Sequence, residues 1–387
     1  MSESRAFDVL VYGATGFTGR LVAEYLARQY GDSMSWAMAG RSADKLARVR
    51  EEINAPPHTA LLTADADSAS SLEAMVNQAR VVITTVGPYQ LYGNELVAAC
   101  ARTGTDYVDL CGEPAWMHQM IGMHSEAASR SGARIVFSCG FDSIPFDLGV
   151  LLLQEKARAE LGRPANRVRG RVRSMKGRFS GGTAASFKAT MAAAAQDPAV
   201  IGVLRNHFAL TPGFEGPEQP GLTKPVEDTV LNTWCAPFIM APINTKNIHR
   251  SNFLMGHPYG EDFVYDEMVM TGPGDTGEDM AKAMARSNDL GDKEGPKPGE
   301  GPSKEEREAG SYDLLFVGHA DDAGPVQVVV TGDMDPGYGS TSKMISEAAL
   351  CLTDEASELP GGIYTPAAAF GLSIIDRLRK RAGMTFD

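Results

Sequence analysis

The sequence predicts an α/β protein in which a doubly wound parallel sheet of the Rossmann type precedes a second, α+β domain. Over the first 150 residues, short apolar runs alternate with amphipathic segments, which is typical of parallel strands with helices on both faces. Beyond Arg163 this pattern stops, and a strand with two-residue alternation follows. We therefore expect a first domain over 1–150 and a second over 151–336, with helices in 337–387 packed back on the first.

Each element of the first domain is predicted from an apolar run and the turn residues after it. Strands are expected at 7–12, 36–39, 58–64, 80–86, 106–110 and 134–138. Helices are expected at 17–30, near Leu72, and at 94–102 and 114–131. In such a sheet ligands bind beyond the carboxyl ends of the strands, so the residues that follow each strand are the candidates for a site.

The stretch GATGFTG joins the first strand to the first helix. Gly13 permits a tight turn, Gly16 lets a ligand approach the backbone, and Gly19 lets the helix pack close to the strand. A helix N-terminus with free N–H groups attracts phosphates, and Thr15 and Thr18 can add hydroxyl donors. In this strand–turn–helix setting the motif indicates a dinucleotide site rather than an ordinary turn.

The end of the second strand predicts which nicotinamide cofactor is bound. A carboxylate at this place would accept a hydrogen bond from the ribose 2′-hydroxyl of NAD. The chain instead offers Arg41, whose guanidinium suits a 2′-phosphate, with Lys45 one helical turn further on. Ser42 can cap the next helix and also donate to the phosphate. These residues favour NADP(H), the alternative being that Arg41 is a solvated surface arginine.

Residues after the third and fourth strands are expected to contact the two ends of the cofactor. Asp65 either meets an adenine amino group or lies in the N-cap region of the helix near Leu72. The stretch that follows the fourth strand is expected near the nicotinamide. It consists of Thr85, Val86, Gly87, Pro88 and Tyr89. The fifth strand ends at Cys111 and Glu113, and the sixth at Asp142.

The second half of the chain contains fewer clear signals. Arginines at every second position from Arg167 to Arg173 predict a strand with one basic face, which is either solvated and balanced by acidic neighbours or a surface for an anionic carrier. Further strands are expected at 261–270, 312–319 and 327–333, the last two antiparallel, and helices at 184–195, 342–352 and 367–381. The polar stretch 272–310 is expected to be a long surface loop or lid.

The composition excludes several classes of protein. A net charge of −13 argues against general nucleic-acid binding. We find no signal-peptide pattern and no apolar run long enough to span a membrane. Five scattered cysteines without a CxxC motif predict reduced thiols in a cytoplasm, and the scattered histidines predict no metal site. Peripheral contact with a membrane stays open, because the tail over 367–386 is apolar and basic.

Several short stretches together carry a resemblance to a known family. They are GATGFTG at Gly13, AGRS at Ala39, TVGPYQLYG at Thr85, YVDLCGE at Tyr107, IVFSCGFDSIPFDLG at Ile135, SGGTAAS at Ser180, GEGPS at Gly299, DPGYGSTSKM at Asp335 and the tail from GGIYTPAAAFG. The sequence resembles the saccharopine dehydrogenase-like oxidoreductases, and within them the trans-acting enoyl reductases of actinobacterial lipid biosynthesis. The resemblance spans nearly the whole chain and is weakest over 198–270.

The resemblance implies an NADP-dependent reductase that reduces the carbon–carbon double bond of a lipid, polyketide or isoprenoid substrate. It implies that Gly13, Thr15, Gly16, Phe17, Thr18 and Gly19 hold the pyrophosphate and that Arg41 holds the 2′-phosphate. It also implies that a polyketide synthase or an acyl carrier presents the substrate. A homodimer, in which a second copy of this chain is the partner, stays open as well.

Such a reaction needs a hydride for the β-carbon, a donor for the enolate oxygen and an acid for the α-carbon. Tyr89 is the first candidate for the donor or acid, unless it only packs on the cleft wall. Glu113 and Asp142 could orient the carboxamide, act as the acid or cap a helix. Cys111 is expected beside the cofactor as an inert thiol, and Lys188 could meet a phosphate of the substrate or water.

Two alternative functions stay open. One is a saccharopine-type dehydrogenase that reduces an imine, although we cannot match the arginines that would grip an amino-acid carboxylate. The other is a non-catalytic NADP-binding protein at lipid surfaces. Loss of turnover with retained NADPH affinity in Tyr89, Glu113 or Asp142 variants would distinguish an enzyme from such a binding protein.

Overall fold

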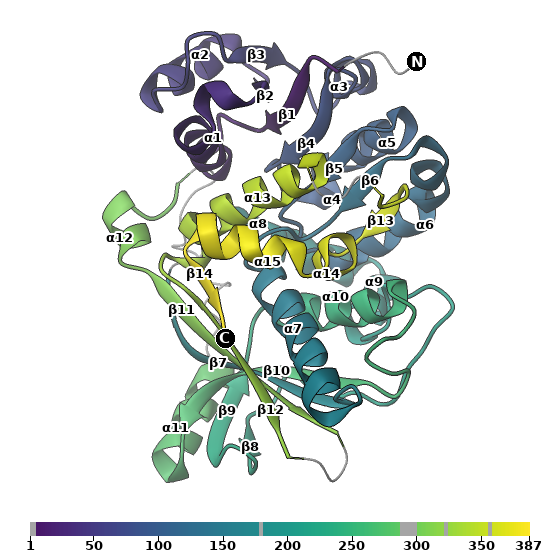
Figure 1. The fold of residues 1–387 in the computed structure, drawn as a ribbon, viewed down its shortest axis with the longest axis vertical. Coiled ribbons are helices and arrows are strands. Elements are labelled where there is room, and N and C mark those ends of the chain that lie inside the picture. Colours follow the sequence, from purple (N-terminus) through teal and green to yellow (C-terminus); the bar gives the residue numbers. More distant parts are fainter. Residues whose placement is uncertain (1–4, 178–180, 287–299, 321–323, 355–357) are drawn as a thin grey trace.

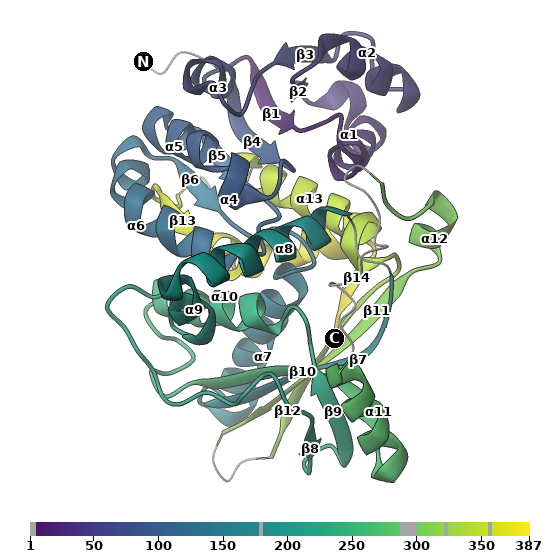
Figure 2. The same ribbon diagram turned by 180° about the vertical axis from the view of Figure 1, so that it is seen from behind.

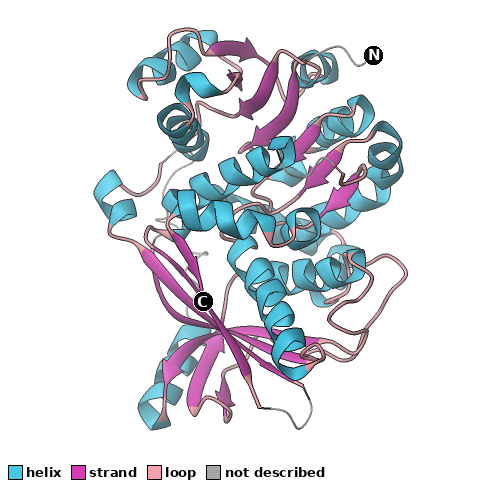
Figure 3. Cartoon of the chain, viewed as in Figure 1, coloured by secondary structure: helices cyan, strands magenta, loops and turns pink. Residues whose placement is uncertain are grey.

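Two seven-stranded sheets form the framework of the protein (Figure 1). The computed structural model describes residues 5–177, 181–286, 300–320, 324–354 and 358–387. Figure 3 colours the helices and the strands differently and shows the two sheets toward opposite ends of the longest axis. Among the described helices, we find none that combines the length and the apolar character needed to cross a membrane.

The first sheet is parallel, with the strand order β13-β6-β5-β4-β1-β2-β3. Its strands are β1 (Phe7–Tyr12), β2 (Trp36–Gly40), β3 (Ala60–Thr63), β4 (Ala79–Thr84), β5 (Asp106–Val108), β6 (Arg134–Val136) and β13 (Gly362–Tyr364). The inner strands are continuous apolar runs because helices cover both of their faces. The predicted Rossmann-type sheet is thus confirmed, and β13, which we did not predict, extends it at the β6 edge.

Two layers of helices enclose this sheet. They include α1 (Phe17–Gln29), α2 (Ala43–Glu52), α3 (Ala69–Val76), α4 (Tyr89–Tyr92), α5 (Asn94–Thr103), α6 (Pro114–Ser131) and α13 (Thr341–Asp354). Helices α3, α5 and α6 pack in a row, whereas α13 packs beside α1 and against β4 and β5 on the opposite face (Figures 1 and 2). A segment from far along the chain therefore covers the middle of the first sheet.

The second sheet is mixed and has the strand order β14-β12-β11-β7-β10-β9-β8. Its strands are β7 (Arg167–Lys176), β8 (Val226–Asp228), β9 (Thr233–Pro237), β10 (Val264–Gly272), β11 (Ser311–His319), β12 (Val326–Gly332) and β14 (Met384–Phe386). The predicted antiparallel pairing of β11 with β12 is confirmed, and β7 pairs in parallel with β10. The predicted α+β character of this half is confirmed as well.

The remaining helices lie in the middle of the molecule or against the second sheet (Figure 1). They are α7 (Ile144–Leu161), α8 (Gly181–Gln196), α9 (Pro198–Arg205), α10 (Ala241–Leu254), α11 (Gly274–Arg286), α12 (Lys304–Glu308), α14 (Pro366–Phe370) and α15 (Ser373–Arg377). Helix α7 leaves the first sheet after β6 and packs on β11 and β12, so it runs through residue 150, the predicted domain boundary. Figure 2 shows α8 crossing in front of the middle of the molecule.

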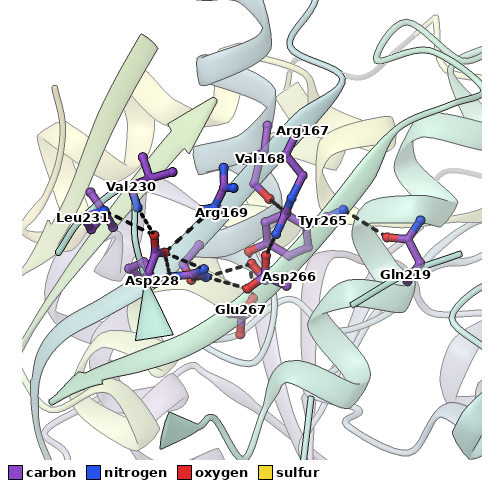
Figure 4. A network of polar contacts seen from close by, with 12 residues as sticks. Arg167, Val168, Arg169, Gln219, Asp228, Val230, Leu231, Tyr265, Asp266 and Glu267 are labelled. Carbon is purple, nitrogen blue, oxygen red and sulfur yellow. Dashed lines mark hydrogen bonds and ion pairs between the residues drawn. The ribbon is translucent and has the colours of Figure 1, made fainter. Parts of the chain in front are cut away.

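Arg167, Arg169 and Arg171 of β7 form an ion-pair network with two aspartates (Figure 4). Asp228 accepts from Arg171 at 2.8 Å, and Asp266 accepts from Arg171 at 2.7 Å and from Arg167. Only 3% of the Arg171 side chain is exposed. The alternative of a basic face balanced by acidic neighbours therefore describes these residues better than a free cationic surface, with the correction that Arg171 is buried rather than solvated.

The structure corrects two predicted segments. Part of the expected loop 272–310 is helical, since α11 and α12 lie within it, and 287–299 lie outside the described residues. Helix α11 was not predicted because its segment is rich in glycine. Gly277 packs so close to Gly272 that a Cβ atom on Gly277 would lie 1.9 Å from the Gly272 carbonyl oxygen. The helix expected at 367–381 is interrupted at Gly371, whose φ is 56°. There α14 ends, and α15 and a π-helical turn follow.

Candidate active site

A cavity of about 850 Å³ lies beyond the carboxyl ends of the strands of the first sheet. It extends from the glycine-rich stretch after β1 to the inner side of α8 and the start of α10. Most of the predicted site residues line it. They are Gly13, Thr15, Gly16, Phe17, Thr18, Gly19, Arg41, Asp65, Thr85, Val86, Gly87, Pro88, Tyr89 and Asp142. The predicted residues Ser42, Lys45, Cys111 and Glu113 do not border the cavity.

The glycine-rich stretch between β1 and α1 forms a close-fitting turn. Gly13 has a φ of 88°, and a Cβ atom on Gly19 would lie 2.1 Å from the Gly13 carbonyl oxygen, so both positions require glycine. Gly16 is the N-cap of α1, and no described side chain caps the helix, so the amides of its first turn are left without a side-chain partner. The residues of this turn line the cavity. These features fit a pyrophosphate group, which a helix N-terminus attracts.

Arg41 lies at the other end of this part of the cavity. Its side chain is exposed and makes no ion pair with any described residue. The charge of Arg41 acts on the buried phenol of Tyr12, although burial and Asp65 prevail and raise the pKa of Tyr12 to about 12. An unpaired guanidinium at the end of β2 fits a 2′-phosphate. Ser42 caps α2 by accepting from the Lys45 amide at 3.3 Å, which was one of its two predicted roles.

Asp65 borders the same end of the cavity. The N-cap of α3 is Ser68, whose side chain accepts a hydrogen bond from Ser71. Asp65 instead accepts from the Asp67 amide at 3.2 Å, so it shapes the turn before the helix without capping it. Its carboxylate remains at the cavity wall, where contact with an adenine amino group stays a prediction.

Tyr89 is buried with its hydroxyl group fully engaged. The hydroxyl donates to the Thr84 carbonyl oxygen at 3.3 Å and accepts from the Leu110 amide at 3.0 Å. Burial, together with the charge of Asp109, raises the pKa of Tyr89 well above its ordinary value. The ring also packs against Trp116 at a centroid distance of 5.5 Å. To give its proton to a substrate, Tyr89 would have to release Thr84.

Glu113 joins three elements without bordering the cavity. Its carboxylate accepts from the amides of Tyr89 and Gln90, both at 2.9 Å, where α4 begins. It also accepts from the Ser186 hydroxyl of α8 at 2.7 Å. Cys111 is equally buried, and burial together with Asp109 raises the pKa of its thiol well above the ordinary value. These contacts suit positioning residues better than groups that touch a ligand.

Asp142 brings a buried carboxyl group to the cavity wall. It lines the cavity after β6 and makes no hydrogen bond with any described residue. A Cβ atom on Gly112 would lie 3.4 Å from its Oδ2 atom, so the carboxyl also reaches the end of β5. Burial raises the pKa of Asp142 to about 7, because the charged form loses water without gaining a partner. A carboxyl of this kind can hold a proton near neutral pH.

The structure adds one residue that we did not select from the sequence. Tyr338 lies in a π-helical turn, Pro336–Ser340, directly before α13, and lines the cavity. Its hydroxyl is buried and has no hydrogen-bond partner among the described residues. The quoted stretch DPGYGSTSKM contains it, but only the return of α13 to the first sheet places it at the site. No local pattern carries that information.

The far part of the cavity is apolar. It is bordered by Phe187 and Met191 of α8, Leu204 of α9, and Ile239 and Ile243 at the start of α10. At its mouth, the exposed fraction is 52% for Met191 and 39% for Ile239. The cavity thus combines a polar end at the glycine-rich turn with an apolar end that opens to solvent.

Comparisons with known proteins agree with this geometry. Residues 9–136 match the saccharopine dehydrogenase NADP binding domain. A Mycobacterium tuberculosis protein, provisionally named a trans-acting enoyl reductase, is 40% identical over 402 residues, covering 97% of this chain and 96% of that protein. The trans-acting enoyl reductases of Mycobacterium bovis and Mycobacterium ulcerans are 36% and 34% identical, each over 97% of this chain and 96% of the relative.

A solved structure shares the fold. Apo saccharopine dehydrogenase (L-Glu forming) from Saccharomyces cerevisiae superposes with a TM-score of 0.59 at 12% sequence identity. The superposition covers 98% of this chain and 99% of that one. At this identity the likeness concerns the architecture and does not extend to the chemistry.

Proposed function

The chain belongs to the family of the trans-acting enoyl reductases, and from this premise we propose that it reduces the carbon–carbon double bond of an enoyl substrate carried by a partner. It is an NADP-dependent oxidoreductase, because its first sheet is the NADP-binding domain of the saccharopine dehydrogenases. The observation that carries the proposal is the cavity of about 850 Å³, which runs from the glycine-rich turn to an apolar mouth and is lined by a carboxyl group without a partner among the described residues.

The residues at the polar end suit NADPH. The first turn of α1 would hold the pyrophosphate, Arg41 the 2′-phosphate, and the stretch from Thr85 to Pro88 would border the nicotinamide. When bound, NADPH supplies the hydride. The protein then has to orient the substrate, exclude water and deliver one proton.

Asp142 is proposed as the acid. Addition of a hydride to the β-carbon breaks the C=C π bond and moves an electron pair onto the carbonyl oxygen. The enolate then collapses, and the α-carbon takes the proton from the Asp142 carboxyl group, which leaves a carboxylate that water reprotonates. A pKa of about 7 is well matched to this step, because the group is protonated often enough to act and acidic enough to release its proton.

The apolar end supports an acyl chain as the substrate. Phe187, Met191, Leu204, Ile239 and Ile243 offer an apolar wall without charged groups of their own. Each buried methylene group of a chain gains about 0.8 kcal/mol from such a wall. A medium or long acyl chain is therefore favoured over a small polar acid.

The surroundings of the mouth support an acidic carrier as the partner. Lys176, Lys188 and Arg205 are exposed, and each is adjacent in sequence to a residue that lines the cavity. None of the three forms an ion pair with a described residue. On a chain with a net charge of −13, such a cationic rim favours the approach of an acidic carrier domain that delivers a thioester.

Oxidation of NADPH by the purified protein tests the proposal. The panel contains medium and long enoyl thioesters, an isoprenoid enone, and 2-oxoglutarate with lysine, each repeated with NADH. We expect turnover of the enoyl thioesters with NADPH and little with NADH. Turnover of the lysine mixture alone would show an imine-reducing dehydrogenase. Tight NADPH binding without turnover, also when the thioester is loaded on an acyl carrier domain, would contradict an enzymatic role.

A further inference from the structure

Hydrogen bonds hold the turn that carries Tyr338 in place beside the first sheet. The Asp335 carboxylate accepts from the amides of Tyr338 and Gly339, both at 2.8 Å. The next residue after the turn, Thr341, accepts from the Phe141 amide at 3.0 Å through its hydroxyl group. The backbone of Tyr338 is thereby fixed to the loop that ends in Asp142, although the two residues are distant in sequence.

The side chain of Tyr338 is positioned as firmly as its backbone. Its ring packs edge-on against Phe17, with the centroids 4.9 Å apart and an interplanar angle of 86°. Only 3% of the residue is exposed. Its hydroxyl nevertheless lacks a hydrogen-bond partner among the described residues, although the residue borders the cavity. A buried hydroxyl without a partner is costly, and in a ligand cavity it indicates that the ligand supplies the partner.

Tyr338 and Asp142 border the same part of the cavity. Burial raises the pKa of Tyr338 well above its ordinary value, and the charges of Asp335 and Asp142 act in the same direction. The phenol therefore keeps its proton throughout the neutral range and can act as a donor. Phe17 stands on one side of Tyr338, and Asp142 reaches toward Gly112 at the end of β5. The two polar groups thus border the cavity between the glycine-rich turn and the end of β5, across which the nicotinamide half is proposed to lie.

We propose that Tyr338 is a catalytic residue that donates a hydrogen bond to the carbonyl oxygen of the enoyl substrate. This inference rests on the proposed function. As the hydride adds to the β-carbon, the electron pair of the C=C bond becomes charge on the carbonyl oxygen, and the Tyr338 hydroxyl stabilises that charge without losing its proton. Asp142 then protonates the α-carbon. Tyr338 therefore stabilises the enolate oxygen, and Asp142 supplies the proton for the α-carbon.

Tyr89, the first candidate from the sequence, is less suited to this role. Its hydroxyl already donates to Thr84 and accepts from Leu110, so a substrate would have to break a buried hydrogen bond. Tyr338 has no such contact to break. A preorganised, unoccupied donor is what stabilisation of a developing oxyanion requires.

The test compares Tyr338→Phe with Tyr312→Phe, which is its matched control. The Tyr312 hydroxyl bonds Ser340 of the same turn at 2.9 Å but does not border the cavity. For Tyr338→Phe we expect kcat on an enoyl thioester to fall by about 10²- to 10³-fold, as for the loss of one oxyanion donor. The Kd for NADPH, measured by fluorescence, should stay within about twofold, since cofactor binding does not use this hydroxyl. Tyr312→Phe should lower the melting temperature and keep kcat.

A spectroscopic measurement separates a donor to the carbonyl from a merely structural role. In the complex with NADP⁺, which cannot reduce the substrate, the infrared band of a ¹³C-labelled enone carbonyl should shift to lower frequency in the wild type. This shift should disappear in Tyr338→Phe and persist in Tyr312→Phe. An unchanged kcat or an unchanged carbonyl band in folded Tyr338→Phe would overturn the inference. If only the Kd for NADPH rose, Tyr338 would be a cofactor contact instead, whereas an inactive wild type would contradict the proposed function itself.

Discussion

At the scale of a single residue, we propose that Arg41 determines which nicotinamide cofactor the cavity suits. It is exposed at the end of β2 and unpaired among the described residues, whereas Lys45 lies outside the cavity. We expect Arg41→Ala to weaken NADPH binding roughly 10- to 100-fold, because a charged hydrogen bond contributes about 1.5–3 kcal/mol. NADH binding should change little. Fluorescence titration with both cofactors measures this, and Lys45→Ala, as the control, should alter neither affinity by more than about twofold.

The opposite result for Arg41→Ala and Lys45→Ala would contradict this assignment. If Lys45→Ala weakened NADPH binding and Arg41→Ala did not, the 2′-phosphate would lie further along α2 than the cavity suggests, and Arg41 would be the solvated arginine of the alternative interpretation.

Asp142 should give the reaction a characteristic pH dependence. Burial raises the pKa of Asp142 to about 7, so the carboxyl keeps its proton below this pH and loses it above. The charge of Asp142 adds to the raised pKa values of Cys111 and Tyr338, and both groups stay neutral in this range. We expect kcat to be level below pH 7 and to fall about tenfold per unit above it. The measurement is kcat from pH 5.5 to 9 at saturating substrate.

Substitution of Asp142 tests whether this group causes the fall in kcat above pH 7. Asp142→Asn should lower kcat and remove the fall above pH 7, while Asp67→Asn, at the Arg41 end of the cavity, should keep it. If kcat of Asp142→Asn still fell above pH 7, another group would supply the proton to the α-carbon.

At the scale of elements, Glu113 connects β5 to α4 and α8. Its carboxylate accepts hydrogen bonds from Tyr89, Gln90 and Ser186. Glu113→Gln turns one acceptor into a donor that faces these donors, so we expect the free energy of unfolding to fall by about 1–3 kcal/mol. KM should rise more than kcat falls, because α8 forms part of the cavity wall. Urea unfolding and steady-state kinetics measure the two effects.

Ser186→Ala is the control for this prediction, since it removes only the bond to α8. It should reproduce part of the rise in KM with a smaller loss of stability. A Glu113→Gln variant that kept its stability but lost kcat would instead indicate that Glu113 is an acid or a direct ligand.

Elements with strong local signals were predictable from the sequence, and those defined by distant contacts were not. The predicted bounds of α6 match the structure because Pro114 begins the helix and Gly132 follows its end. Helix α10 was missed because its buried residues include Asn244, Lys246 and Arg250, which are typical of a surface. The structure accommodates them through long-range bonds, such as that from Arg250 to the Leu210 carbonyl oxygen at 2.5 Å.

At the scale of the whole molecule, the same distinction applies to the site. The residues that follow β1, β2, β4 and β6 could be selected because a parallel sheet gathers its strand ends at one edge. Tyr338 could not, because its place depends on the packing of α13 against α1 and β4. The apolar mouth likewise combines α8, α9 and α10, whose mutual arrangement no sequence period encodes. Local chemistry was therefore predictable, and the substrate side of the cavity was not.

The two short strands near the end of the described chain bear on how such an enzyme can evolve. Strand β13 completes the nucleotide-binding sheet beside β6, and β14 lies at the edge of the second sheet beside β12. If residues 1–150 were moved alone into another protein, β6 would lose β13 and expose an unpaired edge. The cofactor half is thus a poor module for gene shuffling. New substrate specificities are more accessible through point changes around the mouth than through domain exchange.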